Sequence, residues 1–121
     1  MVIRYNKPPS QRQLQVAEEI RHALCEIFIR NELSHPFFEK YVLTISQVRI
    51  SPDLKLATAF VVIPLDLDEK QLLKMLNDIS SSIKKLLSKK VKLRVMPTIR
   101  FAGDSAFNSG YEVDAILKNL K

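Results

Sequence analysis

Apolar residues recur along this chain in two different rhythms, which predict its helices and strands in order. After Ser10, a plausible helix N-cap, one apolar stripe follows intervals of three and four residues: Leu14, Ala17, Ile20, Leu24, Ile27 and Phe28. This spacing places the stripe on one face of a long first helix. We expect the helix to end between Asn31 and Ser34, because the next residues are His35-Pro36 and a residue before proline disfavours helix.

The next two segments show the two-residue alternation of strands. Residues 41–50 and 54–63 are rich in β-branched side chains, and Ser51-Pro52-Asp53 between them has the composition of a turn. We therefore expect two strands paired as an antiparallel hairpin. The alternation changes phase at Ser46-Gln47, which predicts a β-bulge there.

Helical spacing returns after Asp68 and Glu69, two acids that suit a helix N-terminus. The apolar stripe of this segment is Leu72, Leu73, Leu76, Ile79, Ile83, Leu86 and Leu87. The serine run 80–82 interrupts it with poor helix formers, whose hydroxyl groups compete for backbone hydrogen bonds. We expect a break or bend within residues 77–82 that divides the segment into two helices.

A third strand is expected at about 93–101, where Leu93, Val95, Ile99 and Phe101 alternate. Pro97 lacks a ladder donor and therefore favours an edge or bulged strand. A loop with Gly103 and Gly110 follows, and then a short last helix at 111–120 through Val113, Ile116, Leu117 and Leu120. The expected order is α-β-β-α-(kink)-α-β with a short C-terminal helix, a two-layer α+β sandwich whose helices cover one face of the sheet.

Length and composition fit this scheme. The chain has 121 residues, enough for one domain, and 46% of them are hydrophobic. We expect residues 1–9, with two prolines and two cations, to be a flexible basic arm, and 10–121 to be the domain. No apolar run approaches the ~20 residues of a membrane span, and the N-terminus lacks a signal-peptide core. The single cysteine, Cys25, cannot form an internal disulfide, which fits the reducing cytoplasm. We expect the protein to act as a monomer.

The net charge of +6 is concentrated in one stretch. Between Asp78 and Asp104 the chain has seven cations and no acid: Lys84, Lys85, Lys89, Lys90, Lys92, Arg94 and Arg100. Cations without a counter-charge repel one another, and a polyanionic partner, most commonly nucleic acid, explains such a surface.

Helix geometry predicts which of these residues face outward. If Ile79, Ile83, Leu86 and Leu87 point inward, then Ser81, Lys85, Ser88 and Lys89 point away from the core, with Lys84 at the border. We interpret the seven cations as candidate phosphate contacts, with Ser80, Ser81, Ser82 and Ser88 as candidate hydroxyl donors to RNA. Arg49 and Lys55 beside the hairpin turn, and Arg4 and Lys7 in the arm, are further candidates. A solvated basic face without a dedicated ligand remains the alternative.

The sequence gives little support for a catalytic site or a metal site. His22, Cys25 and Glu26 have the i, i+3, i+4 spacing of helical ligands, but no second cluster completes a metal site. The chain has no phosphate-binding glycine loop, no plausible catalytic triad and no aromatic RNP pattern. We therefore expect no enzyme, no metal and no cofactor. Two function classes remain: an RNA-binding protein, and a basic adaptor whose cationic face binds an acidic protein or a membrane surface.

Several motifs, in order and at the right spacing, resemble the bacterial ribosome-binding factor A family. They are Val16-Ala17-Glu18-Glu19-Ile20-Arg21, Val48-Arg49-Ile50-Ser51-Pro52-Asp53-Leu54, Leu76-Asn77 with Ile83-Lys84-Lys85-Leu86-Leu87, Leu93 to Phe101, and Asp104 six residues before Gly110. The resemblance extends from about Arg12 to Leu120.

The resemblance implies a type II KH-like fold without the usual Gly-x-x-Gly loop. It also implies a factor that binds the immature small (30S) ribosomal subunit and assists late maturation of 16S rRNA near its 5′ end, chiefly in the cold. The family has Ala-x-Gly at the bend between its paired helices, where this chain has Ile79-Ser80-Ser81. In the loop after Asp104, Ala106 stands where a serine is usual.

Overall fold

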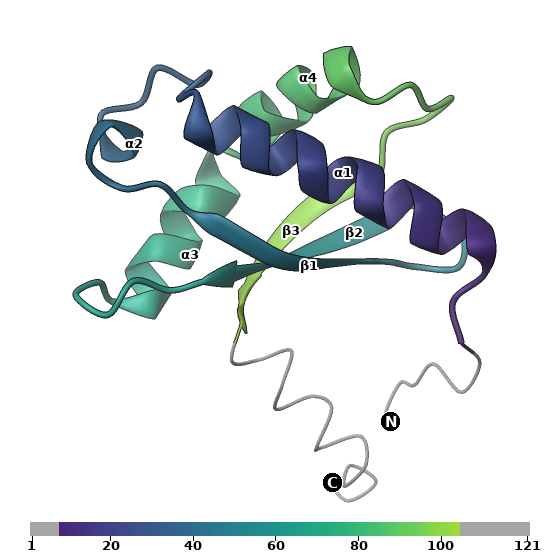
Figure 1. The fold of residues 1–121 in the computed structure, drawn as a ribbon, viewed down its shortest axis with the longest axis horizontal. Helices are drawn as coiled ribbons and strands as arrows, with labels where there is room; N and C mark the ends of the chain where they lie inside the picture. The colour runs from purple at the N-terminus through teal and green to yellow at the C-terminus, as the bar shows by residue number, and fades with distance from the viewer. Residues whose placement is uncertain (1–7, 105–121) are drawn as a thin grey trace, which may run out of the picture.

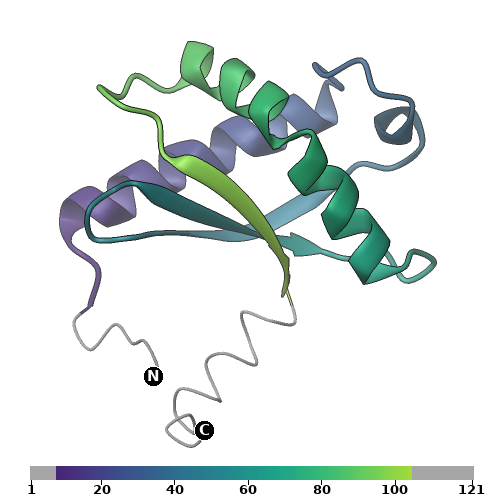
Figure 2. The same cartoon turned by 180° about the vertical axis from the view of Figure 1, so that it is seen from behind.

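Four helices and three strands make up the part of the chain that the computed structural model describes, residues 8–104. Their order is α1 (Gln11–Ile29), α2 (Phe37–Lys40), β1 (Thr44–Ile50), β2 (Leu56–Val62), α3 (Glu69–Asp78), α4 (Ser80–Lys90) and β3 (Thr98–Gly103). The strands form one sheet in the order β1-β2-β3, and the helices lie on one side of it (Figures 1 and 2). The expected two-layer α+β arrangement is confirmed. The helix expected at 111–120 lies outside the described residues.

Helix α1 begins at the predicted cap. The side chain of Ser10 accepts a hydrogen bond from the Gln13 backbone N–H, while the Gln13 side chain accepts one from the Ser10 N–H. These two bonds satisfy backbone donors that the first turn leaves unpaired. The Gln13 amide also donates to the Ile50 carbonyl at 2.9 Å, which attaches the start of α1 to the end of β1.

The buried face of α1 differs at three positions from the predicted stripe. Leu14 is 51% exposed, whereas Val16 and Ala23 are buried. At 100° per residue Leu14 lies about 120° around the axis from Ile20, outside the face that meets the sheet. The prediction for Leu14 was therefore wrong.

The hairpin is confirmed with shorter strands than the predicted 41–50 and 54–63. Strands β1 and β2 pair antiparallel, and the register shifts between Ile45 and Gln47, where the bulge was expected. In the turn, the Ser51 hydroxyl donates to Asp53 Oδ1 at 2.6 Å, and Leu54 adopts a positive φ of 61°. Side-chain hydrogen bonds within the turn therefore fix its geometry.

The third strand begins later than predicted. Strand β3 starts at Thr98 and pairs parallel with β2, so it is an edge strand, as expected. Residues 93–97 are irregular, and Val95 is 70% exposed, so the prediction of strand at 93–97 was wrong. Pro97 is buried directly before the strand, where its missing N–H removes no ladder bond.

The predicted break in the second helical segment is confirmed at one residue. Helix α3 ends at Asp78, α4 begins at Ser80, and Ile79 between them has φ −101° and ψ 12°. No side chain caps α4. Serines 80–82 then form its first turn, where weak helix formers cost least because the first backbone N–H groups lack helical partners in any case.

The hydrophobic core joins all the elements, including one that the sequence pattern did not predict. Helix α2 brings Phe38 against Phe28, with ring centroids 5.1 Å apart, and Phe28 also meets Phe101 of β3 at 6.4 Å. Phe28 is fully buried. No helix among residues 8–104 is long and apolar enough to cross a membrane.

Candidate nucleic-acid interface

Helix α4 presents a cationic outer face, as its sequence predicted. Ile83 and Leu87 are fully buried against the core, and Leu86 is half-buried. Four residues point outward and are exposed, as expected: Ser81, Lys85, Ser88 and Lys89. Lys84 is half-buried at the border of this face. Burial of the apolar stripe thus forces the cations to solvent.

The charge continues beyond the helix. After the α4 C-cap at Val91, Lys92 and Arg94 are both exposed on the irregular segment that leads to β3. We call Ser81, Lys85, Ser88, Lys89, Lys92 and Arg94 together the α4 surface. Within residues 8–104, none of its four cations forms a salt bridge. Its positive charge is therefore available to a ligand.

Lys90 behaves differently from its neighbour Lys89. Its ammonium group donates to Glu26 Oε1 at 3.1 Å and to Glu32 Oε2 at 3.0 Å. The pKa of Lys90 is raised above its ordinary value, mainly by the hydrogen bond to Glu32 and then by that to Glu26. The expectation that all seven cations lack a counter-charge was wrong for Lys90, whose charge holds α4 to α1.

Arg100 lies on the other face of the sheet from the helices. Ile99 and Phe101 of β3 point into the core, so Arg100 between them points away from it. Arg49 of β1 and Arg100 both pair in register with Thr58 of β2, which places the two arginines in one row across the sheet. The idea of one continuous basic face from Lys84 to Arg100 was therefore wrong, because successive strand residues face opposite sides.

The four candidate serines differ in exposure and in whether their hydroxyl group is free to donate. Ser81 and Ser82 are exposed, whereas Ser80 is half-buried at the start of α4. The Ser88 hydroxyl donates to the Lys85 carbonyl at 2.7 Å. Because its one proton is used within the helix, Ser88 can offer a ligand only its acceptor lone pairs.

The other candidate residues take part in local structure. Asp68 caps α3 by accepting from the Gln71 N–H at 3.0 Å, as its position predicted. His22 Nε2 lies 3.0 Å from Glu18 Oε2, and Glu26 binds Lys90. Residues 8–104 contain no group of three side chains that could hold a metal. Lys55 is exposed, while Arg4 and Lys7 lie outside the described residues.

Two structural contacts escaped the sequence reasoning. Asn77 Oδ1 accepts the Phe101 N–H at 3.1 Å, and the two glutamates that bind Lys90 lie 64 and 58 positions earlier in the chain. No periodic pattern identifies such long-range pairs. For Asn77 one signal existed, since a polar residue with a short side chain stood at the end of a predicted helix.

Comparison with known proteins identifies the family. The sequence matches ribosome-binding factor A over residues 12–117, nearly its whole length. The chain belongs to the ribosome-binding factor A family. The ribosome-binding factor A of Pelagibacter ubique is 40% identical over 118 residues, which cover 98% of this chain and 97% of the relative.

Solved structures of ribosome-binding factor A share the fold. The crystal structure of the Thermus thermophilus protein superposes with a TM-score of 0.65 at 22% identity, covering 78% of this chain and 98% of the other. A homology model of T. thermophilus ribosome-binding factor A, as fitted into a cryo-EM map of a 30S complex, gives a TM-score of 0.60 at 24% identity, covering 77% and 96%. The mixed α and β architecture is thus that of the family.

Proposed function

We propose that this chain is a ribosome assembly factor that binds the immature small ribosomal subunit through the α4 surface. In this proposal it assists late maturation of 16S rRNA near its 5′ end and catalyses no reaction. The observation that carries the proposal is the set of four exposed cations, Lys85, Lys89, Lys92 and Arg94, without an acidic partner in residues 8–104. Membership of the family supports the choice of ligand.

The physics of the α4 surface favours an RNA backbone as its ligand. Each cation that neutralises a phosphate releases condensed counterions, which drives association at physiological salt. Such contacts position the protein but read no base sequence. Selectivity for the subunit then comes from the shape of the folded RNA and from further contacts.

Similarity to other family members supports the identity of the partner. The T. thermophilus homologue has been fitted into a map of a complex with the 30S subunit. By analogy, we propose a type II KH-like topology, action as a monomer in the cytoplasm, and a division into an arm at 1–9 and a domain at 10–121. Arg49 and Arg100 lie on the opposite face of the sheet and are candidates for RNA contact only if the α4 surface is not the RNA site.

Pelleting with purified 30S subunits tests the proposal. In Lys85→Glu, Lys89→Glu, two outward charges are reversed without touching the core, so we expect binding to weaken about tenfold or more at moderate salt. Lys40→Glu, Lys70→Glu is the matched control, because it makes the same charge change at exposed residues on α2 and α3. Circular dichroism verifies the fold of both variants.

The same pelleting assay distinguishes the proposed function from the alternative, a basic adaptor protein. A basic adaptor would pellet with anionic vesicles as well as with subunits, and it would lose both activities in the α4 variant. Undiminished binding of the folded Lys85→Glu, Lys89→Glu variant to 30S subunits would refute the α4 surface as the RNA site.

A further inference from the structure

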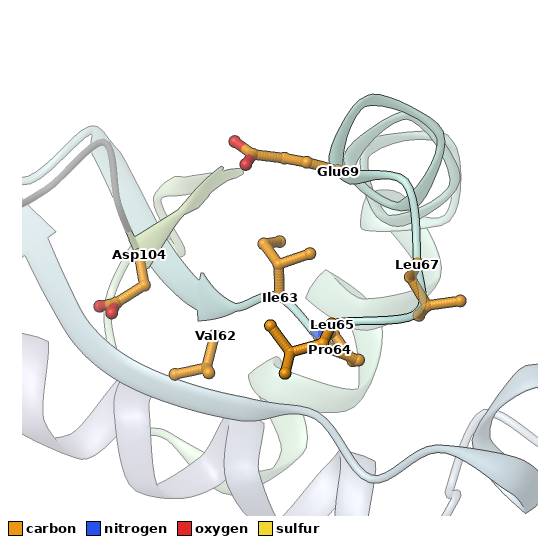
Figure 3. A pocket seen from close by; sticks show the side chains of 7 residues that line it. All are labelled: Val62, Ile63, Pro64, Leu65, Leu67, Glu69 and Asp104. Carbon is orange, nitrogen blue, oxygen red and sulfur yellow. The ribbon is translucent and has the colours of Figure 1, made fainter.

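The connection from β2 to α3 lies at the far end of the α3–α4 pair from the irregular segment 91–97 (Figure 1). A hollow lined by apolar and acidic residues lies at this connection. It has a volume of about 450 Å³ and is lined by Val62, Ile63, Pro64, Leu65, Leu67, Glu69 and Asp104, which Figure 3 shows. These residues come from the end of β2, the connection to α3, the first residue of α3 and the residue after β3. We call it the β2–α3 hollow.

Two apolar residues of the hollow, Val62 and Leu65, are exposed to solvent. Leu65 is fully exposed and Val62 is 42% exposed, and both line the hollow. Exposed apolar side chains gathered around a concave surface are typical of a site that binds another molecule. Nothing in residues 8–104 covers Leu65.

The charge of the hollow determines which kind of molecule fits. The Glu69 carboxylate forms no hydrogen bond or salt bridge within the described residues, and it lies beside the hollow (Figure 3). Asp104, the second acid of the lining, accepts a hydrogen bond from Ser46, which holds its carboxylate in place. Two carboxylates beside an apolar surface repel phosphate and attract a cation with an apolar stem.

We propose that the β2–α3 hollow docks a cationic protein segment of the small ribosomal subunit, one in which Lys or Arg alternates with apolar side chains. This inference rests on the proposed function. Proteins that coat ribosomal RNA must carry cationic segments to neutralise its phosphates. The α4 surface and the hollow therefore match the two chemical components of a ribosomal subunit, with RNA at one end of the helix pair and protein at the other.

A pair of variants with equal charge tests the proposal. Leu65→Lys, Glu69→Lys removes the apolar contact and makes the rim cationic. Ile29→Lys, Glu19→Lys makes the same charge change at exposed residues of α1, far from the hollow in sequence, so the net charge of the two variants is identical. Binding of each is measured to purified 30S subunits and to protein-free 16S rRNA, with circular dichroism as the check on folding.

We expect the hollow variant to bind subunits about tenfold more weakly than the α1 variant, while the two bind protein-free rRNA equally. Equal binding of both variants to subunits would overturn the proposal. A loss of rRNA binding by the hollow variant alone would also overturn it, because the hollow would then be an RNA site. Failure of the proposed function is distinguishable, since in that case the Lys85→Glu, Lys89→Glu variant would bind subunits normally.

Photo-cross-linking identifies the occupant directly. With p-benzoylphenylalanine at position 65, we expect a cross-link within 30S particles to a ribosomal protein, at a Lys- or Arg-rich segment. A cross-link only to rRNA contradicts the proposal. A cross-link only to a second copy of this chain, with concentration-dependent association in sedimentation, contradicts it in favour of self-association through the basic α4 surface.

Discussion

The ammonium group of Lys90 lies 3.0 Å from Glu32 Oε2, although the two residues are 58 positions apart in the chain. The same ammonium group binds Glu26, so one cation connects the last turn of α4 with the end of α1 and the turn that follows. Its side chain is only 23% exposed, and that of Glu32 only 22%. Breaking such a contact leaves carboxylates that are partly shielded from water without a partner.

Adjacent lysines should therefore respond in opposite ways to the same substitution. Lys90→Met keeps most of the aliphatic stem but removes the charge, so we expect lower thermal stability with little change in RNA affinity. Lys89→Met should leave stability unchanged and weaken binding to rRNA. Thermal unfolding and filter binding of the two single variants make the comparison. A stability loss in Lys89→Met equal to that in Lys90→Met would contradict the assignment.

The contribution of the Lys90 contact should depend on pH. The hydrogen bond from Lys90 lowers the pKa of Glu26 below its ordinary 4.5, so this stabilisation exists above the ordinary value and is lost as pH falls through the lowered pKa. The raised pKa of Lys90 has the reverse sign, and its stabilisation is lost as pH rises through that pKa. The difference in unfolding free energy between wild type and Lys90→Met should be constant from about pH 6 to 9 and shrink in acid. Urea titrations at several pH values measure it, and a difference that grows in acid would refute the contact.

Asn77 holds the outer edge of β3. Its Oδ1 accepts the Phe101 N–H at 3.1 Å, on the side of β3 that faces away from β2. Asn77→Ala leaves this backbone donor without its acceptor, which should cost about 1–3 kcal/mol. Asn77→Asp keeps the acceptor and should retain most of the stability. Amide hydrogen exchange at Phe101 reports the bond, and exchange as slow in Asn77→Ala as in the wild type would show that the bond is unimportant.

Local sequence patterns predicted the elements that local physics controls. The Ser10 cap, the bulge near Ser46 and the break at Ile79 depend on residues within a turn or two of each other, and all three were found where expected. The alternation of Leu93 and Val95 predicted a strand that does not exist, because pairing requires a partner strand and β2 meets β3 only from Thr98 onward. Short helix α2 had no periodic signal, and its Phe38 is fixed by packing against Phe28.

The candidate site was likewise predictable only where local helix geometry determines it. The outward direction of Lys85 and Lys89 follows from the helix period, and the structure agrees. Arg100 is separated from these lysines because the helices cover only one face of the sheet. Lys90 does not contribute free charge to the α4 surface, because it pairs with two glutamates from a distant part of the chain. Both features depend on tertiary structure, which the periodicity of the sequence does not predict.

Gly103 leaves room for the end of the Glu69 side chain. A Cβ atom added at Gly103 would lie 2.5 Å from Glu69 Oε2, and its φ is not positive, so backbone conformation does not demand glycine. The clash falls on the end of a flexible side chain, so Gly103→Ala should cost only about 1 kcal/mol. Glu69→Ala in the same chain should remove that cost, which a double-mutant cycle of urea unfolding measures. If the losses of unfolding free energy from Gly103→Ala and Glu69→Ala simply add in the double variant, the clash is not with Glu69.

The salt dependence of RNA binding should distinguish cations that touch phosphate from those that do not. Each phosphate contact contributes a slope of about −0.7 to −0.9 in log K against log salt concentration. Lys85→Ala, Lys89→Ala should therefore reduce the slope for 16S rRNA by about 1.4 to 1.8, because two exposed cations of the α4 surface are lost. Lys90→Met should leave the slope unchanged, since its charge is already neutralised by Glu26 and Glu32.

Arg100→Ala completes the series, because Arg100 lies on the opposite face of the sheet and a single RNA backbone on α4 does not reach it. We expect its slope to equal that of the wild type in fluorescence titrations from low to moderate salt. A reduced slope for Arg100→Ala with an unchanged slope for Lys85→Ala, Lys89→Ala would show that the RNA binds to the sheet and not to α4. The row of Arg49, Thr58 and Arg100 would then be the interface, and α4 would be an ordinary solvated helix.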